Sequence, residues 1–173
     1  SGKWHMAIDH KAFPQPEDQG FDWTRSNRGA RSAMPSRVEG FASNQREDPY
    51  SLDENGYPYH QTSEDALTFL KENHDKPFFF YYATWLVHTP IHTRSEKLLE
   101  KYCKKLGVER PSDNQGWTKK GRNNPFYFAM IEELDYYIGK VFNYLHRTED
   151  PRWPGHRLEE NTYIIFTSDN GGM

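Results

Sequence analysis

Apolar residues recur at helical spacing in three parts of the chain. The clearest stretch begins at Pro125, where apolar positions three and four residues apart predict a long helix with one side against a core. Its apolar positions are Met130, Ile131, Leu134, Ile138, Val141, Phe142 and Leu145. The same spacing predicts a helix over about 95–106, closed by Gly107, and a shorter one over about 63–72. We expect Thr62 and Ser63 to cap the shorter helix.

Two continuous apolar runs alternate with these helices. Residues 78–83 follow the helix-breaking Pro77, and residues 162–167 follow a polar loop. Uninterrupted apolar runs of this length are typical of strands that are covered on both faces. Strands separated by helices favour the α/β class, so we expect a mostly parallel central sheet flanked by helices.

The composition argues against several classes of protein. The 173 residues include 22 Lys and Arg against 25 Asp and Glu, a net charge of −3 without a basic stripe, so we expect no nucleic-acid partner. Aromatic residues make up 16% of the chain, which favours a packed core. The longest apolar run is about half as long as a membrane helix requires, so we expect no membrane span. A single cysteine, Cys103, excludes an internal disulfide framework and a cysteine-based zinc site.

Side chains with useful chemistry gather near the ends of the predicted strands, where open α/β sheets place their functional groups. Residues two apart in an extended chain point the same way, so Lys3 and His5 would share a face while Trp4 packs behind them. An ammonium group beside an imidazole suits a tetrahedral oxyanion, because one supplies charge and the other moves a proton. Taken alone, the tripeptide also fits a surface lysine and a half-buried histidine.

A second cluster, His88-Thr89-Pro90, follows the first apolar run. Proline keeps the residues before it extended, and a histidine at a strand exit can act as an acid near neutral pH. The alternative is a histidine at the edge of the core.

The third cluster, Asp169-Asn170-Gly171-Gly172, follows the second apolar run. Asp169 and Asn170 offer the oxygen donors that Ca²⁺ and Mg²⁺ prefer, and the two glycines permit the sharp turn that lets both reach one ion. The alternative is a plain turn, because Asn-Gly is a common turn dipeptide.

Taken together and in this order, the clusters resemble the sulfatase family, within the alkaline-phosphatase-like superfamily. The resemblance spans essentially the whole chain, although residues 24–60 and 108–124 match nothing specific. The segments that carry it are Gly2-Lys3-Trp4-His5, Gly20-Phe21-Asp22, Lys76-Pro77-Phe78-Phe79-Phe80-Tyr81-Tyr82-Ala83 with His88-Thr89-Pro90, Ala129-Met130-Ile131-Glu132-Glu133-Leu134-Asp135 through Gly139, and Ile165-Phe166-Thr167-Ser168-Asp169-Asn170-Gly171-Gly172.

The resemblance implies a sulfatase fold and a sulfuric ester hydrolase. Residues 1–173 would be the central portion of one catalytic domain, truncated at both ends. Such enzymes cleave sulfate esters of carbohydrates or aryl groups with a formylglycine nucleophile, made from Cys or Ser in a Cys/Ser-x-Pro-x-Arg motif. A formylglycine-generating enzyme or an anaerobic sulfatase-maturating enzyme carries out that conversion. The motif is absent here, so we expect it upstream, and we expect these 173 residues alone to hydrolyse no sulfate ester.

The resemblance also implies a role for each matching residue. Asp169 and Asn170 would be ligands of a bound Ca²⁺, with Mg²⁺ less favoured. Lys3 would bind a sulfate oxygen, and His5 would handle the proton of the formylglycine hydrate. His88 would contact the sulfate and protonate the leaving oxygen. Cys103 lies on a helix stripe without the motif's Pro and Arg, so we expect it to be a buried structural thiol.

Two other readings stay open at this point. A phosphodiesterase or phosphonate hydrolase of the same superfamily shares the metal-strand pattern, and a non-catalytic relative could bind a sulfated glycan without cleaving it. We also expect the segments 24–60 and 108–124 to line the mouth of the pocket and select a sulfated small molecule or glycan. The side chains suited to an anionic sugar are Arg25, Arg28, Arg31, Arg37, Tyr57, Tyr59 and Trp117.

Location follows only from the resemblance. Related sulfatases are exported, so we expect a periplasmic or secreted protein, or a lysosomal one if the source is eukaryotic. The sequence contains no Asn-x-Ser/Thr glycosylation acceptor, which favours a bacterial protein.

Overall fold

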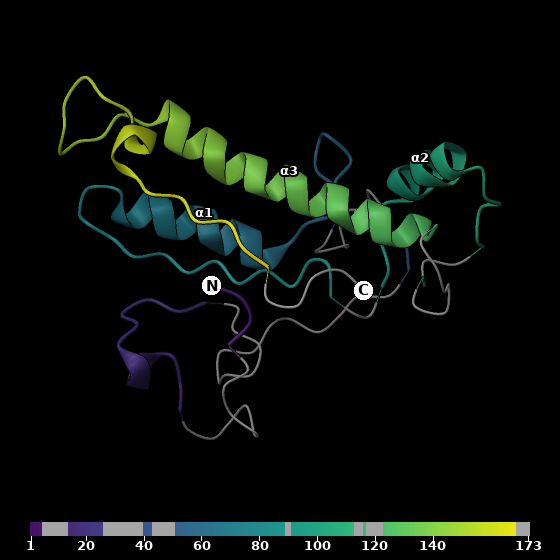
Figure 1. Ribbon diagram of the computed structural model, residues 1–173, viewed down its shortest axis with the longest axis horizontal. Helices are drawn as coiled ribbons and strands as arrows, with labels where there is room; N and C mark the ends of the chain where they lie inside the picture. The colour runs from purple at the N-terminus through teal and green to yellow at the C-terminus, as the bar shows by residue number, and fades with distance from the viewer. Residues whose placement is uncertain are drawn as a thin grey trace. The chain divides into compact units, whose positions relative to one another are not determined.

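The computed structural model describes residues 1–4, 14–25, 40–42, 51–88, 91–112, 116 and 123–168 (Figure 1). These ranges contain the α-helices α1 (Gln61–Asn73), α2 (Glu96–Leu106) and α3 (Pro125–Arg147), and the short 3-10 helices η1 (Glu17–Gln19) and η2 (Leu158–Asn161). The chain divides into two compact units. Unit 1 comprises residues 1–35, 61–85 and 137–173, and unit 2 comprises residues 36–60 and 86–136.

The predictions for the second and third helices are confirmed. α2 begins after Ser95, whose hydroxyl accepts a hydrogen bond from the Leu98 amide at 3.3 Å. It ends at Gly107, which has the left-handed φ of 65° that favours glycine at this position. α3 begins at Pro125 as expected, where the missing amide hydrogen costs nothing. None of the helices in the described ranges is both long and apolar enough to cross a membrane.

The start of α1 differs from the prediction. The helix begins at Gln61, so Thr62 and Ser63 lie in its first turn and are not its cap. Both residues are buried, and the Ser63 hydroxyl forms a 2.6 Å hydrogen bond with the Tyr82 hydroxyl. The Ser63 hydroxyl, which suggested a cap, therefore joins α1 to the segment that follows it.

Each unit has its own apolar core. In unit 1, α1 packs on the second half of α3 through Phe69, Leu70 and Leu145, with Leu158 completing the cluster. In unit 2, α2 packs on the first half of α3, and the buried cluster is Ile91, Leu99, Cys103, Phe126 and Met130. The prediction that Cys103 is a buried thiol is confirmed, since it is 4% exposed and forms no disulfide.

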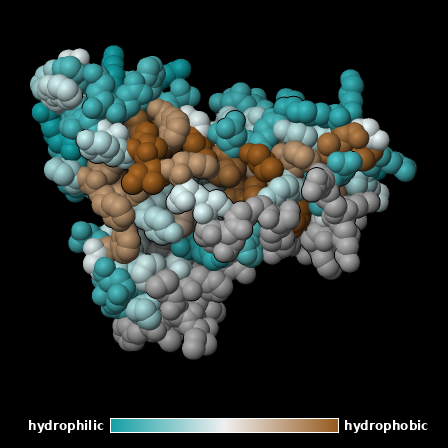
Figure 2. Space-filling model, viewed as in Figure 1, coloured by the Kyte–Doolittle hydropathy of each residue, from teal (hydrophilic) through white to brown (hydrophobic). Residues whose placement is uncertain are grey.

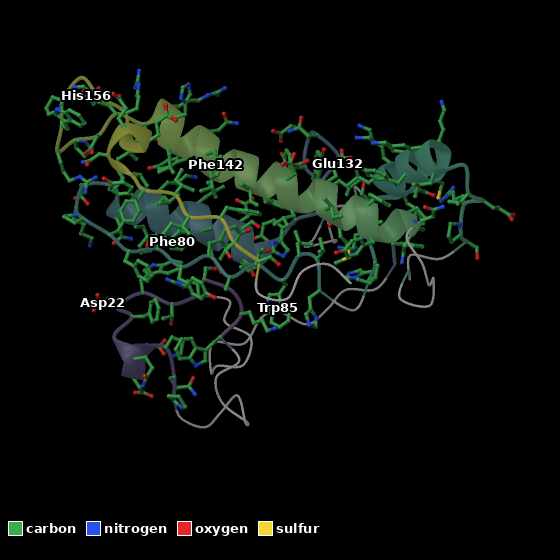
Figure 3. The ribbon with its side chains drawn as sticks, viewed as in Figure 1. Asp22, Phe80, Trp85, Glu132, Phe142 and His156 are labelled. Atoms are coloured by element: carbon green, nitrogen blue, oxygen red, sulfur yellow. The ribbon has the colours of Figure 1, made fainter. Side chains whose placement is uncertain are left out.

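Residues 78–82 run extended across the core of unit 1. Phe78 and Phe80 pack on the core cluster, and the ring of Phe80 stacks on Phe69 with centroids 4.6 Å apart. The alternate side chains face away from the core, with Phe79 79% and Tyr81 54% exposed. Figure 3 labels Phe80 in this position. The alternation is that of a strand with one covered face.

Residues 162–168 are extended as well, but their apolar side chains are not buried. Tyr163 and Ile165 are almost fully exposed, and Ile164 and Phe166 are 49% and 74% exposed. Apolar side chains reach the surface on the face of the molecule shown in Figure 2. Within the described ranges, the β pairing consists of isolated bridges, so the predicted central sheet is not observed there. Burial on two faces requires a layer on each side of a sheet, and in the described ranges residues 162–168 pair with no strand from which such a sheet could form.

A polar network joins α3 to the segment that precedes α2 in unit 2. The Thr93 hydroxyl donates a hydrogen bond to the carboxylate of Glu133, and it accepts one from the Ser95 amide at 3.1 Å. The Ser95 hydroxyl donates to the carbonyl oxygen of Gly56 at 2.9 Å. Burial raises the pKa of Glu133 to about 7, against a lowering effect of the Thr93 hydrogen bond, and the Glu132 carboxylate raises it further.

The raised pKa of Glu133 makes the stability of the protein depend on pH. Between its ordinary value of 4.5 and about 7, this acid is ionised in the unfolded chain but protonated in the folded one. Its contribution to the free energy of unfolding therefore falls as the pH rises through this range, by at most about 3 kcal/mol. We expect Glu133→Gln to remove this fall. Urea unfolding of the unaltered protein and of Glu133→Gln between pH 4 and pH 8 measures the two free energies of unfolding. A difference between these free energies that stays constant with pH would contradict the prediction.

Candidate functional site

The first residues of the chain pair with the end of the extended segment 78–83. Gly2 and Ala83 form a parallel bridge, in which the Lys3 amide donates to the Ala83 carbonyl at 2.7 Å. The Ala83 amide in turn donates to the Ser1 carbonyl at 2.9 Å. This pairing brings Lys3 next to the exit of the predicted strand, where functional groups of parallel sheets gather.

Gly2 makes this pairing possible. Its φ is +105°, which side chains other than glycine rarely adopt. A Cβ atom at this position would lie 1.9 Å from the Ala83 carbonyl oxygen, far inside contact distance. Only glycine therefore fits where the motif meets the predicted strand.

Lys3 lies against an aromatic side chain from the same exit. Its ammonium nitrogen is 5.5 Å from the centre of the Trp85 ring, within the range of a cation–π contact. Figure 3 labels Trp85, just beyond the end of the extended segment 78–83. The contact holds the positive charge at the point where this segment ends.

A small cavity of about 20 Å³ lies beside Lys3 in unit 1, large enough for a water molecule. Besides Lys3, half of its lining residues are aromatic, and the lining residues are Ser1, Gly2, Trp4, Pro16, Phe21, Trp23, Thr24 and Tyr81. An apolar wall beside a fixed ammonium group strengthens the interaction of that group with an anion. In unit 1 alone, the space admits nothing as large as a substrate.

Trp4 is anchored within unit 1 by its own contacts. Its indole nitrogen donates to the Pro14 carbonyl at 2.9 Å, and its ring meets that of Phe21 edge to face with centroids 6.1 Å apart. The Phe21 ring also contacts that of Phe79. The Gly20-Phe21-Asp22 motif therefore contributes packing that fixes the orientation of the segment containing Lys3.

His88 belongs to unit 2, and its side chain is exposed. The residues just before it, Leu86 and Val87, pack on the unit 2 core, and Ile91 beyond it is part of that core. An exposed imidazole between two anchored apolar residues can meet a ligand while its backbone is held in place.

The other predicted site residues, His5, Asp169 and Asn170, lie outside the described residues, as do Thr89 and Pro90. In the described ranges, no three His, Cys, Asp or Glu side chains come together as a metal-binding group. The donor set of the predicted site nevertheless suits Ca²⁺, because a carboxylate and an amide both offer hard oxygen atoms.

Two of the residues expected to line the pocket mouth have other contacts. The Tyr57 ring stacks on Tyr136 with centroids 3.8 Å apart, and its hydroxyl donates to Glu132 at 2.7 Å. Burial and this hydrogen bond raise its pKa. The guanidinium of Arg25 lies 5.5 Å from the Trp23 ring centre. Arg28, Arg31, Arg37 and Trp117 lie outside the described residues, and Tyr59 is 38% exposed.

The family model described as Sulfatase matches residues 1–173. The chain belongs to the sulfatase family. The segments that resembled this family in the sequence therefore belong to a match that runs through both units.

Curated relatives of this sulfatase-family chain include bacterial and mammalian proteins. It is 36% identical over 126 residues to a protein named Sulfatase from Formosa agariphila, covering 68% of this chain and 20% of that protein. It is 28% identical to N-acetylgalactosamine-6-sulfatase from Canis lupus familiaris, covering 62% of this chain and 16% of the relative. Arylsulfatase H from Homo sapiens is 28% identical to this chain, and the match covers 62% of this chain and 14% of that protein. The chain thus spans about a fifth or less of these relatives. No solved structure matches it significantly.

Sequence analysis of this sulfatase-family chain did not single out Trp85, which the structure places against Lys3 in unit 1, or Glu133, which binds Thr93 in unit 2. In the sequence, Trp85 is one more apolar residue between the first apolar run and His88. An aromatic residue near a predicted cationic site is nevertheless a signal for a cation–π contact. Glu133 carried one signal, because a carboxylate in the apolar part of a predicted helix is unusual.

Proposed function

We propose that this chain forms part of the active site of a sulfuric ester hydrolase. The observation that carries the proposal is the match of the sulfatase family over the whole chain. The pairing of Gly2 with Ala83 supports it, because the pairing brings Lys3 to the end of the segment that precedes His88 in the sequence.

Each residue has a proposed role. The Lys3 ammonium binds a sulfate oxygen and stabilises the negative charge that spreads over the sulfuryl group as the ester bond breaks. The His88 imidazole donates a proton to the departing ester oxygen. His5 takes a proton from the nucleophile. Fixed cationic groups suit this reaction because the charge that they stabilise increases in the transition state.

Asp169 and Asn170 are the proposed ligands of Ca²⁺, since Asp and Asn side chains supply the oxygen atoms that this ion prefers. The bound ion would add a fixed positive charge beside the sulfate oxygens. The formylglycine nucleophile and the maturation enzyme that makes it also belong to the proposal, and the residue that is modified would lie elsewhere in the full-length protein.

We further propose that residues 78–83 and 162–167 are neighbours in a mostly parallel sheet. The alternation of packed and exposed rings along 78–82 and the exposed apolar side chains of 163–166 support this arrangement. Strands in such sheets are covered on both faces. The exposed rings are the surface that the rest of the domain would cover.

The proposed substrate is a sulfated small molecule or glycan, bound with help from the segments 24–60 and 108–124. Tyr57 is not available as a stacking platform on the face that meets Tyr136. Arginines with planar, bidentate donors would suit sulfate or carboxylate groups of a sugar. We propose export to the periplasm or outside the cell, or to the lysosome if the source is eukaryotic.

The experiment is to incubate the full-length protein, matured to contain formylglycine, with an aryl sulfate and with sulfated sugars. We expect release of inorganic sulfate, measured by ion chromatography, and loss of this release after Ca²⁺ is removed with a chelator. Hydrolysis of an aryl phosphodiester in preference to the sulfate would indicate the phosphodiesterase relative. Binding of a sulfated glycan without sulfate release would indicate a non-catalytic protein.

A further inference from the structure

The segment around His88 is held by groups on both sides of it. Val87 packs on the unit 2 core, and Ile91 is 5% exposed within that core. The Ile91 carbonyl accepts a hydrogen bond from the Gly116 amide at 2.7 Å, and the Arg94 carbonyl accepts one from the Ala42 amide at 2.7 Å. These contacts fix the backbone on the far side of His88.

The deepest anchor of this segment is polar. Thr93 is 1% and Glu133 is 7% exposed, and the Thr93 hydroxyl donates a hydrogen bond to the Glu133 carboxylate. The same hydroxyl accepts from the Ser95 amide, and Ser95 caps α2. A buried carboxyl group without a partner costs stability, so burial of Glu133 favours its contact with Thr93.

Glu133 is not the obvious residue for this position. It lies on α3 one turn from Met130, which belongs to the apolar core, and an apolar side chain would fill the space without a desolvation cost. Its neighbour Glu132 instead makes contacts with Lys101 and Tyr57 and is 15% exposed. Within the described residues, the buried acid is hydrogen-bonded to the segment that precedes α2.

We propose that Glu133 and Thr93 are positioning residues that hold the loop carrying His88 in the geometry for protonating the leaving oxygen. This proposal rests on the function proposed above, because it assigns the pair a purpose only if His88 is the acid. Neither side chain acts on the substrate. Their hydrogen bond ties the loop to α3.

The test compares two substitutions at position 93 in the full-length protein. Thr93→Val removes the hydroxyl with little change of shape, leaving the Glu133 carboxylate and the Ser95 amide without their partner. Thr93→Ser keeps the hydroxyl and should rescue the loss. Thr68→Val is the matched control, because it removes a threonine hydroxyl bonded to the Glu64 carbonyl on the exposed side of α1.

The first measurement is the rate of hydrolysis of aryl sulfates whose phenols differ in acidity. A misplaced acid matters most when the leaving oxygen is basic, so Thr93→Val should lose about tenfold or more in kcat/KM with a poor leaving group. The loss should shrink to within about threefold with a good one. Equal losses with all leaving groups would overturn the proposal.

The second measurement, amide hydrogen exchange, does not depend on activity. We expect faster exchange in the peptide that spans residues 86–98 for Thr93→Val, and unchanged exchange there for Thr68→Val and Thr93→Ser. Unchanged exchange in Thr93→Val would also overturn the proposal. If the unaltered protein releases no sulfate from any ester, the proposed function fails, and the exchange data still decide whether the pair anchors the loop.

Discussion

The variant His88→Ala is expected to lose about 10²–10⁴ in hydrolysis rate with an alkyl or sugar sulfate, in the full-length protein. This corresponds to roughly 3–5 kcal/mol of transition-state stabilisation. The physical reason is that a basic leaving oxygen departs slowly unless a proton reaches it as the bond to sulfur breaks. The measurement is kcat for a sugar sulfate and for a nitrophenyl sulfate, whose leaving group needs little protonation.

The comparison between leaving groups separates the acid role from a structural one. With nitrophenyl sulfate, the loss in His88→Ala should be much smaller than with the sugar sulfate. His88 is exposed and its neighbours Val87 and Ile91 hold the backbone, so the change should leave stability within about 0.5 kcal/mol. The same loss with both substrates would show that His88 has no part in protonation.

The second large effect is expected at Gly2. Gly2→Ala should abolish the pairing with Ala83, because the added Cβ would lie 1.9 Å from the Ala83 carbonyl oxygen. Strain at the positive φ adds about 1–3 kcal/mol to the cost. Since Lys3 is placed by this pairing, we expect kcat/KM to fall at least about 100-fold. The yield of folded protein, its melting temperature and its activity are the measurements.

Gly20→Ala is the matched control for Gly2→Ala. Gly20 also belongs to unit 1 and also has a positive φ, of 90°, but no atom lies within 4 Å of the position where its Cβ would be. It should therefore show the cost of the backbone strain alone, about 1–2 kcal/mol, with activity retained. If the two variants behave alike, the close approach of Gly2 to Ala83 is not what constrains this position.

The helices could be predicted from the sequence because their signals are local. The apolar spacing after Pro125 gave the start of α3, and Ser95 and Gly107 marked both ends of α2 by their capping chemistry. The start of α1 could not be placed in the same way. Ser63 has the chemistry of a cap, but its hydroxyl bonds to Tyr82, a residue that lies far from it in the sequence.

The strands show where local patterns are insufficient. A continuous apolar run predicts what a segment requires, which is burial on both faces, but not which segments provide it. Phe78 and Phe80 find one covering layer in α1 and α3, whereas Phe79 and Tyr81 remain exposed. The segment 162–167 has extended backbone without a paired neighbour in the described ranges.

The part of the candidate site that lies in short sequence motifs could be predicted. Lys3 stood out by its spacing from His5, and the structure places it next to Trp85 and the end of the predicted strand. The contacts of Trp85 with Lys3 and of Thr93 with Glu133 could not be predicted, because each contact arises only when distant segments pack together. The convergence of Lys3 with the remaining site residues is a prediction from the family resemblance.

The measurement that tests the central claim most directly is a crystal structure of the full-length protein with Ca²⁺ and sulfate bound, with the ion located by its anomalous scattering. We expect oxygen atoms of Asp169 and Asn170 at about 2.3–2.6 Å from one cation. The side chains of Lys3, His5 and His88 should lie within hydrogen-bond distance of the sulfate beside it. An ion bound away from Asp169 and Asn170, or a sulfate that contacts none of the three cationic side chains, would contradict the claim.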